Sequence, residues 1–199
     1  MKLTAVRILI AVNIAAYVCQ WLFGFQVELL FALWPLQPVQ GQYLFHAWQV
    51  LTYAFLHDPT QIFHILFNMF GLWTFGTGIE SYVGARRVLN CYFASIVAAA
   101  SCQLFVPPLF GAAPGPTLGA SGGVFGLLLA YAYLFPKRKV ILLIAPVPMP
   151  AWLFATLYAG VELFLGVTGT QAGVAHFAHL GGMIGSLLVI SQWRIRVPS

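Results

Sequence analysis

Six long apolar stretches constrain this chain more than any other feature of its sequence. A helix needs roughly 20 predominantly apolar residues to cross a bilayer of about 30 Å. Only 7% of the residues are charged, against roughly 25% in a soluble domain, so the chain has too few polar groups to cover a surface in water. We therefore predict an all-α, multi-pass membrane protein, with residues 1–199 as one domain and spans near 4–24, 62–82, 88–107, 118–135, 151–168 and 174–192.

The basic residues predict the orientation of these spans. All nine lie at the N-terminus, between spans two and three, between spans four and five, or at the C-terminus. With six spans these places share one side of the membrane, which the positive-inside rule makes the cytoplasm. The net charge of +5 thus reflects topology, and no nucleic-acid partner is expected because the residues form no continuous stripe. They are Lys2, Arg7, Arg86, Arg87, Lys137, Arg138, Lys139, Arg194 and Arg196.

The first outer connection, residues 25–61, is long and unusually apolar. Its only charges are Glu28 and Asp58, and aromatic residues run through it. Such residues favour the headgroup level, so we expect the connection to lie partly in the outer leaflet. The first span follows Lys2 and Arg7 without a clear A-x-A site after it, which predicts an uncleaved anchor. The compact six-span form suggests a bacterial plasma membrane.

Polar side chains within the spans are the candidates for function, because they are costly in a membrane. Spans two, four and six all run from outside to inside, so residues counted from their outer ends give comparable depths. At about 1.5 Å per residue, five polar side chains lie within roughly 10 Å of those ends. This shared layer predicts one site built by three helices, from His64, Asn68, Ser121, His176 and His179.

Ser121 lies in the segment 119–123, whose sequence GASGG matches the G-x-S-x-G pattern of a serine nucleophile. A serine needs a base to take its proton, and a histidine can do so near neutral pH. Asn or His side chains, together with the free backbone N–H groups at a helix start, can stabilise an oxyanion. Glu80 lies roughly 24 Å along its helix from His64. Asp58, the only aspartate of the chain, lies in the first outer connection and stays an open alternative. We therefore expect a Ser–His dyad rather than a triad.

Glycines predict how the two halves of this dyad meet. Small residues let membrane helices approach closely, and several surround Ser121 and follow His179. His179, Gly182 and Ser186 are spaced i, i+3 and i+7, which places them on one helix face. We expect that face to pack on the 118–135 span and bring the imidazole to the hydroxyl.

Four segments of the chain resemble motifs of the rhomboid intramembrane serine proteases. Residues 119–122 (GASG) resemble the G-x-S-G nucleophile motif, and residues 178–182 (AHLGG) resemble the A-H-x-x-G motif. Residues 64–68 (HILFN) resemble the H-x-x-x-N motif of the oxyanion site. Residues 76–84 (GTGIESYVG) resemble a structural motif at the inner end of span two. Order and spacing agree as well, so the resemblance covers nearly the whole chain.

The resemblance implies a six-helix rhomboid-like bundle and a serine endopeptidase that needs no cofactor and no metal. Its substrates would be transmembrane segments of other membrane proteins, cleaved near the outer leaflet beside small residues. Ser121 would be the nucleophile and His179 the general base, with His64, Asn68 and the Ser121 backbone N–H at the oxyanion. Supporting positions would be Gly119, Gly122, Phe125, Gly182 and, as a structural anchor, Glu80.

Two positions depart from the family pattern. Gln49 follows Trp48 where the family often has Trp-Arg, which bears on the packing or lipid contacts of the first outer connection. Phe125 keeps the ring that usually lies under the base, often a tyrosine, and loses the hydroxyl.

Two other functions stay open: a non-catalytic binder of membrane helices, or a metal-ion carrier that uses His64, His176 and His179. The metal set has no carboxylate or cysteine joining it from the helices, so a helix-capping or hydrogen-bonded role is favoured for His176. A soluble hydrolase elbow needs a strand before the serine, and the prolines there predict none. Glu162, near the outer end of the 151–168 span, has no assigned role.

Overall fold

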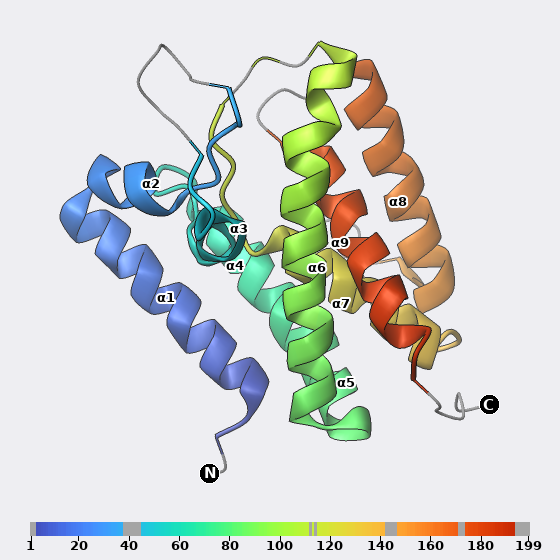
Figure 1. The fold of residues 1–199 in the computed structure, drawn as a ribbon. Helices are drawn as coiled ribbons and strands as arrows, with labels where there is room; N and C mark the ends of the chain where they lie inside the picture. The colour runs from blue at the N-terminus through green and yellow to red at the C-terminus, as the bar shows by residue number, and fades with distance from the viewer. Residues whose placement is uncertain are drawn as a thin grey trace.

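The structure is a computed structural model that describes residues 3–37, 45–111, 113, 115–141, 147–170 and 174–193. The basic residues Lys2, Arg194 and Arg196 of the predicted pattern lie outside these ranges. Within them the chain is mostly helical, and α1 (Ala5–Phe23) begins at the same end of the molecule at which α9 (His176–Ile190) ends (Figure 1). This agrees with an even number of crossings.

Four helical stretches are long and apolar enough to cross a membrane, and they match four of the six predicted spans. The other two predicted spans are helical over shorter lengths, 14 residues in α7 (Ser121–Leu134) and 15 residues in α9. The count of six crossings therefore stays a prediction. The four longer stretches are α1; α4 (Ile62–Gly71), η2 (Leu72–Gly76) and α5 (Thr77–Val83) in succession; α6 (Ala85–Phe105) with η3 (Pro107–Phe110); and α8 (Ala151–Thr168).

The start of α6 differs from the predicted position 88. The helix begins at Ala85, directly after Gly84. Gly84 has φ of 87°, a left-handed conformation that costs glycine little. The chain can therefore leave α5 and enter α6 without a longer loop.

Helix α7 forms the centre of the bundle. Nine of its 14 residues are buried, and it packs against α6, α9 and η2. In contrast, only three of the 18 residues of α8 are buried, and most of its apolar side chains face outward. A helix enclosed by others can be shorter than one that faces lipid, because its neighbours cover its ends.

A short pair of strands requires a small correction to the all-α class. β1 (Lys139–Ile141) pairs antiparallel with β2 (Pro148–Pro150), with Val140 opposite Met149. The prolines before α8 exclude a regular helix there, as the sequence predicts. Proline is tolerated in so small a sheet because both strands are edges.

Gln49 organises the first outer connection. Its side chain is fully buried, and its Oε1 accepts hydrogen bonds from the backbone N–H groups of Trp34 (3.3 Å) and His46 (3.1 Å). Its Nε2 donates to the carbonyl of Leu30 at 3.4 Å. Gln49 thus ties the connection together from inside. The short helices of this region are α2 (Phe25–Phe31), α3 (Gln49–Thr52) and η1 (Tyr53–Phe55).

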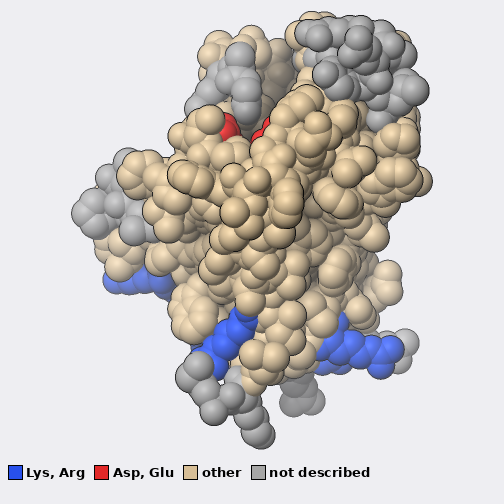
Figure 2. All heavy atoms as spheres, turned by 90° about the vertical axis from the view of Figure 1, so that its left-hand side faces the viewer, with Lys and Arg blue, Asp and Glu red and all other residues tan. Residues whose placement is uncertain are grey.

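The opposite end of the molecule carries the basic residues. On the face drawn in Figure 2, Lys and Arg side chains gather at one end, and the surface beyond them is nearly uncharged. At this end Glu80 of α5 accepts hydrogen bonds from the backbone N–H groups of Ala5 (2.8 Å) and Val6 (3.1 Å). Because these are free donors at the start of α1, the carboxylate anchors the first helix to α5.

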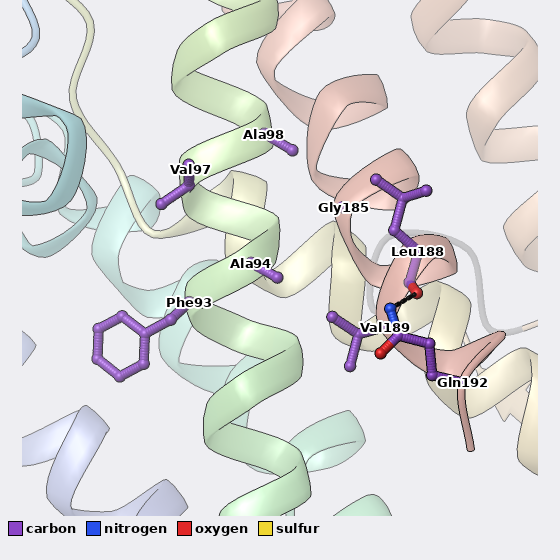
Figure 3. A pocket seen from close by; sticks show the side chains of 8 residues that line it. All are labelled: Phe93, Ala94, Val97, Ala98, Gly185, Leu188, Val189 and Gln192. Carbon is purple, nitrogen blue, oxygen red and sulfur yellow. Dashed lines mark hydrogen bonds between the residues drawn. The ribbon is translucent and has the colours of Figure 1, made fainter. Parts of the chain in front are cut away.

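The seam between α6 and α9 contains a shallow apolar hollow of about 460 Å³ (Figure 3). The helices can come close there because Gly185 has no side chain. A Cβ at this position would lie 2.5 Å from the Ala94 carbonyl oxygen. The polar side chain at its edge, Gln192, donates to the Leu188 carbonyl of its own helix. None of the predicted site residues lines this hollow.

Candidate active site

Ser121 is the first residue of α7, so the helix begins three residues later than the predicted span and the serine lies at its start. The chain reaches it through Gly119, which has φ of 136°, a conformation that strongly favours glycine. A Cβ on Gly119 would also lie only 2.9 Å from Nε2 of His64. The turn therefore needs glycine both for its backbone and for the room it leaves between His64 and Ser121.

The hydroxyl of Ser121 and the imidazole of His179 are in direct contact, with Oγ and Nε2 2.8 Å apart. The ring of Phe125 stacks on that of His179, with centroids 4.2 Å apart and planes 3° from parallel. A Cβ on Gly182 would lie 1.9 Å from the carbonyl oxygen of Gly122. The two glycines thus let α7 and α9 approach closely enough to join the hydroxyl and the ring.

Ser186, the third residue of the predicted packing face, lies elsewhere. Its Oγ is 3.1 Å from Sγ of Cys91 on α6. Gly182 therefore contacts α7 while Ser186, one turn further along, contacts α6.

His64 lies beside the serine with a defined tautomer. Its Nδ1 accepts a hydrogen bond from the backbone N–H of Asp58 at 3.2 Å. A neutral imidazole carries one proton, so in His64 that proton lies on Nε2, the atom nearest to Gly119. This ring therefore offers a donor to the space beside Ser121.

Asn68 is less directly placed than predicted. Its side chain is nearly buried, and its Nδ2 donates to the carbonyl of His64 at 2.8 Å, within the same helix. The observed bond holds the amide on α4. A role at the oxyanion would require the side chain to turn.

Glu162 contradicts the prediction that no carboxylate joins the histidines. Its Oε2 lies 2.9 Å from Nδ1 of His179 and 2.6 Å from Nδ1 of His176. The depth comparison counted only spans that run inward, whereas α8 runs outward. Glu162 is six residues from the end of α8 at Thr168, or roughly 9 Å, so counting from that end would have placed it in the same layer.

His57 is a second buried group that the sequence did not single out. Its side chain is fully buried, and neither ring nitrogen has a hydrogen-bond partner among the described residues. Its ring meets that of His64 edge-on, with centroids 5.1 Å apart. It therefore forms part of the wall behind the site.

Glu162, His176 and His179 could also hold a metal ion, because each offers one ligand atom and these three atoms lie within 4.8 Å of one another. They differ from the set predicted for a carrier, which lacked the carboxylate and included His64. A cavity of about 400 Å³ borders this cluster between α7, α8 and α9, and apolar side chains form most of its walls. Small-molecule and substrate sites commonly combine such walls with a few polar groups.

Comparison with known proteins places these features in a family. The Rhomboid domain family matches residues 44–193. The chain is 33% identical over 185 residues to "Rhomboid protein 1, mitochondrial" of Saccharomyces cerevisiae, covering 84% of this chain and 50% of that protein. It is 29% identical over 130 residues to "Rhomboid protease GlpG" of Klebsiella pneumoniae, covering 65% of this chain and 43% of that protein.

A third relative is "Rhomboid protease GluP" of Bacillus subtilis, 30% identical over 139 residues, which are 69% of this chain and 24% of that protein. The chain thus spans about half, or less, of the length of these curated relatives. The family match takes in both Ser121 and His179 and extends over most of the chain. This chain therefore belongs to the rhomboid family.

Proposed function

We propose that this chain is an intramembrane serine endopeptidase with Ser121 as nucleophile and His179 as general base. The observation that carries the proposal is the 2.8 Å contact between Ser121 Oγ and His179 Nε2. A serine hydroxyl becomes an effective nucleophile when an adjacent base takes its proton. Two relatives, GlpG and GluP, are named proteases, which supports the same reaction class here.

The proton transfers follow from this contact. Oγ of Ser121 attacks the substrate carbonyl carbon while Nε2 of His179 accepts the hydroxyl proton. The same nitrogen then gives that proton to the leaving amine, which breaks the peptide bond and leaves an acyl group on Ser121. Water repeats the cycle in the second half-reaction, with His179 again as the base. The ring of Phe125, stacked on that of His179, supports the imidazole plane in this proposal.

The oxyanion has donors close to Ser121. The N–H groups at the start of a helix have no intrahelical partner, and the helix dipole favours negative charge there. Val124 is the first α7 residue whose N–H bonds back into the turn, to Ala120 at 3.0 Å. The N–H groups of Ser121 and Gly122 are therefore oxyanion donors in this proposal, and Nε2 of His64 adds a third.

The proposed substrates are transmembrane segments that enter the bundle beside α7. Ser121 lies at the end of α7 opposite to the basic segment that begins with Lys137. If the basic end faces the cytoplasm, the cleaved bond lies near the outer leaflet. A helical peptide bond is shielded by its own turn, so substrates with helix-breaking residues near that depth should be cleaved fastest. A bacterial plasma membrane stays our prediction for the location.

The test is cleavage of a labelled transmembrane substrate by the chain reconstituted in liposomes. Ser121→Ala should abolish cleavage, whereas Ser101→Ala, whose exposed hydroxyl bonds only to its own helix at Val97, should cleave like the parent. A fluorophosphonate should label the parent and the Ser101→Ala protein but not Ser121→Ala or His179→Ala. Equal cleavage by Ser121→Ala would disprove the mechanism. If the fluorophosphonate does not label the parent, and metal ions raise its thermal stability, the metal-ion carrier is favoured instead.

A further inference from the structure

Glu162 is the one buried polar residue of α8, a helix whose other buried residues are Ala151 and Ala155. Its side chain is about 8% exposed. An ionised carboxylate at such a place is costly unless other groups satisfy it. Glu162 therefore has either a functional or a strong structural reason to face the interior.

Its partners are both donors at Nδ1. Oε2 of Glu162 lies 2.6 Å from His176 and 2.9 Å from His179. A carboxylate only accepts hydrogen bonds, so both rings carry a proton on Nδ1. In neutral His179, Nε2 therefore carries no proton. This nitrogen lies 2.8 Å from Oγ of Ser121 and can accept the hydroxyl proton. The opposite tautomer would point a donor at the serine and could not act as its base.

We propose that Glu162 is a positioning residue for His179, and that His176 holds Glu162 in place. This inference rests on the proposed function. When Nε2 takes the serine proton, His179 becomes an imidazolium and keeps its Nδ1 proton, while Glu162 stays ionised and balances the new positive charge. The proton then leaves from Nε2 to the departing amine. The carboxylate thus supplies orientation, tautomer and charge, and it does not itself change protonation.

The surroundings leave this role to Glu162. The other titratable side chains near the pair are His64 of α4 and Tyr158 of α8. Neither is negatively charged near neutral pH, so Glu162 is the anion available to His179 among the described residues. The second histidine explains why the carboxylate is fixed: two bonds to one oxygen, from adjacent turns of α9, hold it in one position.

The same three residues have the composition of a metal site, but their geometry favours hydrogen bonds. The N–O distances of 2.6 and 2.9 Å are hydrogen-bond lengths. Ligands about 2.0–2.2 Å from a tetrahedral ion would lie roughly 3.3 Å from one another. An ion would also occupy Nδ1 of His179 and remove the proton that the proposal requires there.

The experiment compares the reconstituted parent with Glu162→Gln, Glu162→Asp and a control on the same helix. The control is Gly160→Ala, where an added Cβ meets no atom within 4 Å. Glu162→Gln keeps the volume and removes the charge, so kcat should fall about 10²- to 10⁴-fold with little change in KM. Its pH–rate profile should also differ from that of the parent, because the imidazolium formed during the reaction loses its counter-charge. Glu162→Asp should restore part of kcat.

A measurement that needs no Glu162 variant keeps the inference testable if those variants fold poorly. In ¹⁵N-histidine-labelled protein, the His179 signals, identified by their loss in His179→Asn, should show a protonated Nδ1 and a bare Nε2. The opposite tautomer overturns the inference. So does a Glu162→Gln enzyme with the parent's kcat and pH profile, or activity that a chelator removes and Zn²⁺ restores.

The two proposals fail in different ways. If the parent neither cleaves nor takes the fluorophosphonate label at Ser121, the proposed function fails. If the parent does both and Glu162→Gln matches it, only the positioning role fails.

Discussion

The Gly182–Gly122 contact allows a quantitative test of how the active site is assembled. In Gly182→Ala the new Cβ would lie 1.9 Å from the Gly122 carbonyl oxygen and 2.7 Å from its carbon. Both are backbone atoms, so no side chain can rotate away, and α7 and α9 must separate by about 1.4 Å or more to restore ordinary contact. The 2.8 Å bond between His179 and Ser121 would then exceed the hydrogen-bonding range.

A misplacement of about 1 Å can cost roughly 10²-fold in rate, so we expect Gly182→Ala to lose at least about 10²-fold in kcat/KM. Overpacking should also lower the free energy of unfolding by about 1–3 kcal/mol. The assays are substrate cleavage in liposomes and thermal unfolding in detergent. Gly160→Ala on α8 serves as the control and should keep both values. A Gly182→Ala protein that cleaves within about threefold of the parent would refute the packing argument.

Three further predictions concern the surroundings of the site. Phe125→Ala removes the ring stacked on His179 and should lower kcat about tenfold or more with KM little changed, as measured by steady-state cleavage; Phe125→Tyr should keep most of the activity. Gln49→Ala removes the side-chain oxygen that accepts hydrogen bonds from the backbone N–H groups of Trp34 and His46 and should cost about 1–3 kcal/mol of local stability. Faster hydrogen exchange at Trp34 would show it, and unchanged exchange would contradict it. Burial, followed by the neighbouring His64, lowers the pKa of His57 from 6.5 to about 3. Below about pH 6.5 the unfolded chain therefore binds a proton at His57 that the folded chain does not bind. The free energy of unfolding should not depend on His57 above about pH 6.5 and should fall by up to about 1.4 kcal/mol per pH unit from there towards pH 3. His57→Phe should have a shallower slope of unfolding free energy against pH, and an equal slope would exclude this cause.

Much of the site was predictable because helix geometry is periodic and local. Depth counted along co-directional spans brought Ser121, His179 and His64 into one layer, and the structure brings these three together. The missed residue, Glu162, lies on α8, which runs the other way and was left out of the depth comparison. It is 14 and 17 residues from His176 and His179 in sequence, but it lies on a different helix, so helical periodicity does not relate their positions.

The direction in which a side chain points was the second property that the sequence could not predict. Asn68 and Ser186 are at the predicted depth and on the predicted face, yet Asn68 bonds to its own helix and Ser186 to Cys91 on α6. The difference between contacting α7 and contacting α6 is one helical turn. Sequence spacing specifies a face only to within such a turn, because the crossing of two helices determines where that face meets each neighbour.

The sequence by itself determined that the chain is a membrane protein, where its long apolar helices run, which end is basic, and which serine and histidine are candidates for catalysis. These properties follow from local composition and from periods of a few residues, which do not depend on how helices pack. The tertiary structure alone decided that the central helix is short, that the buried Gln49 holds the first outer connection together, and that a carboxylate contacts the candidate base. Those properties depend on the approach of helices far apart in sequence, and contacts between backbones at Gly122 and Gly182 set that approach.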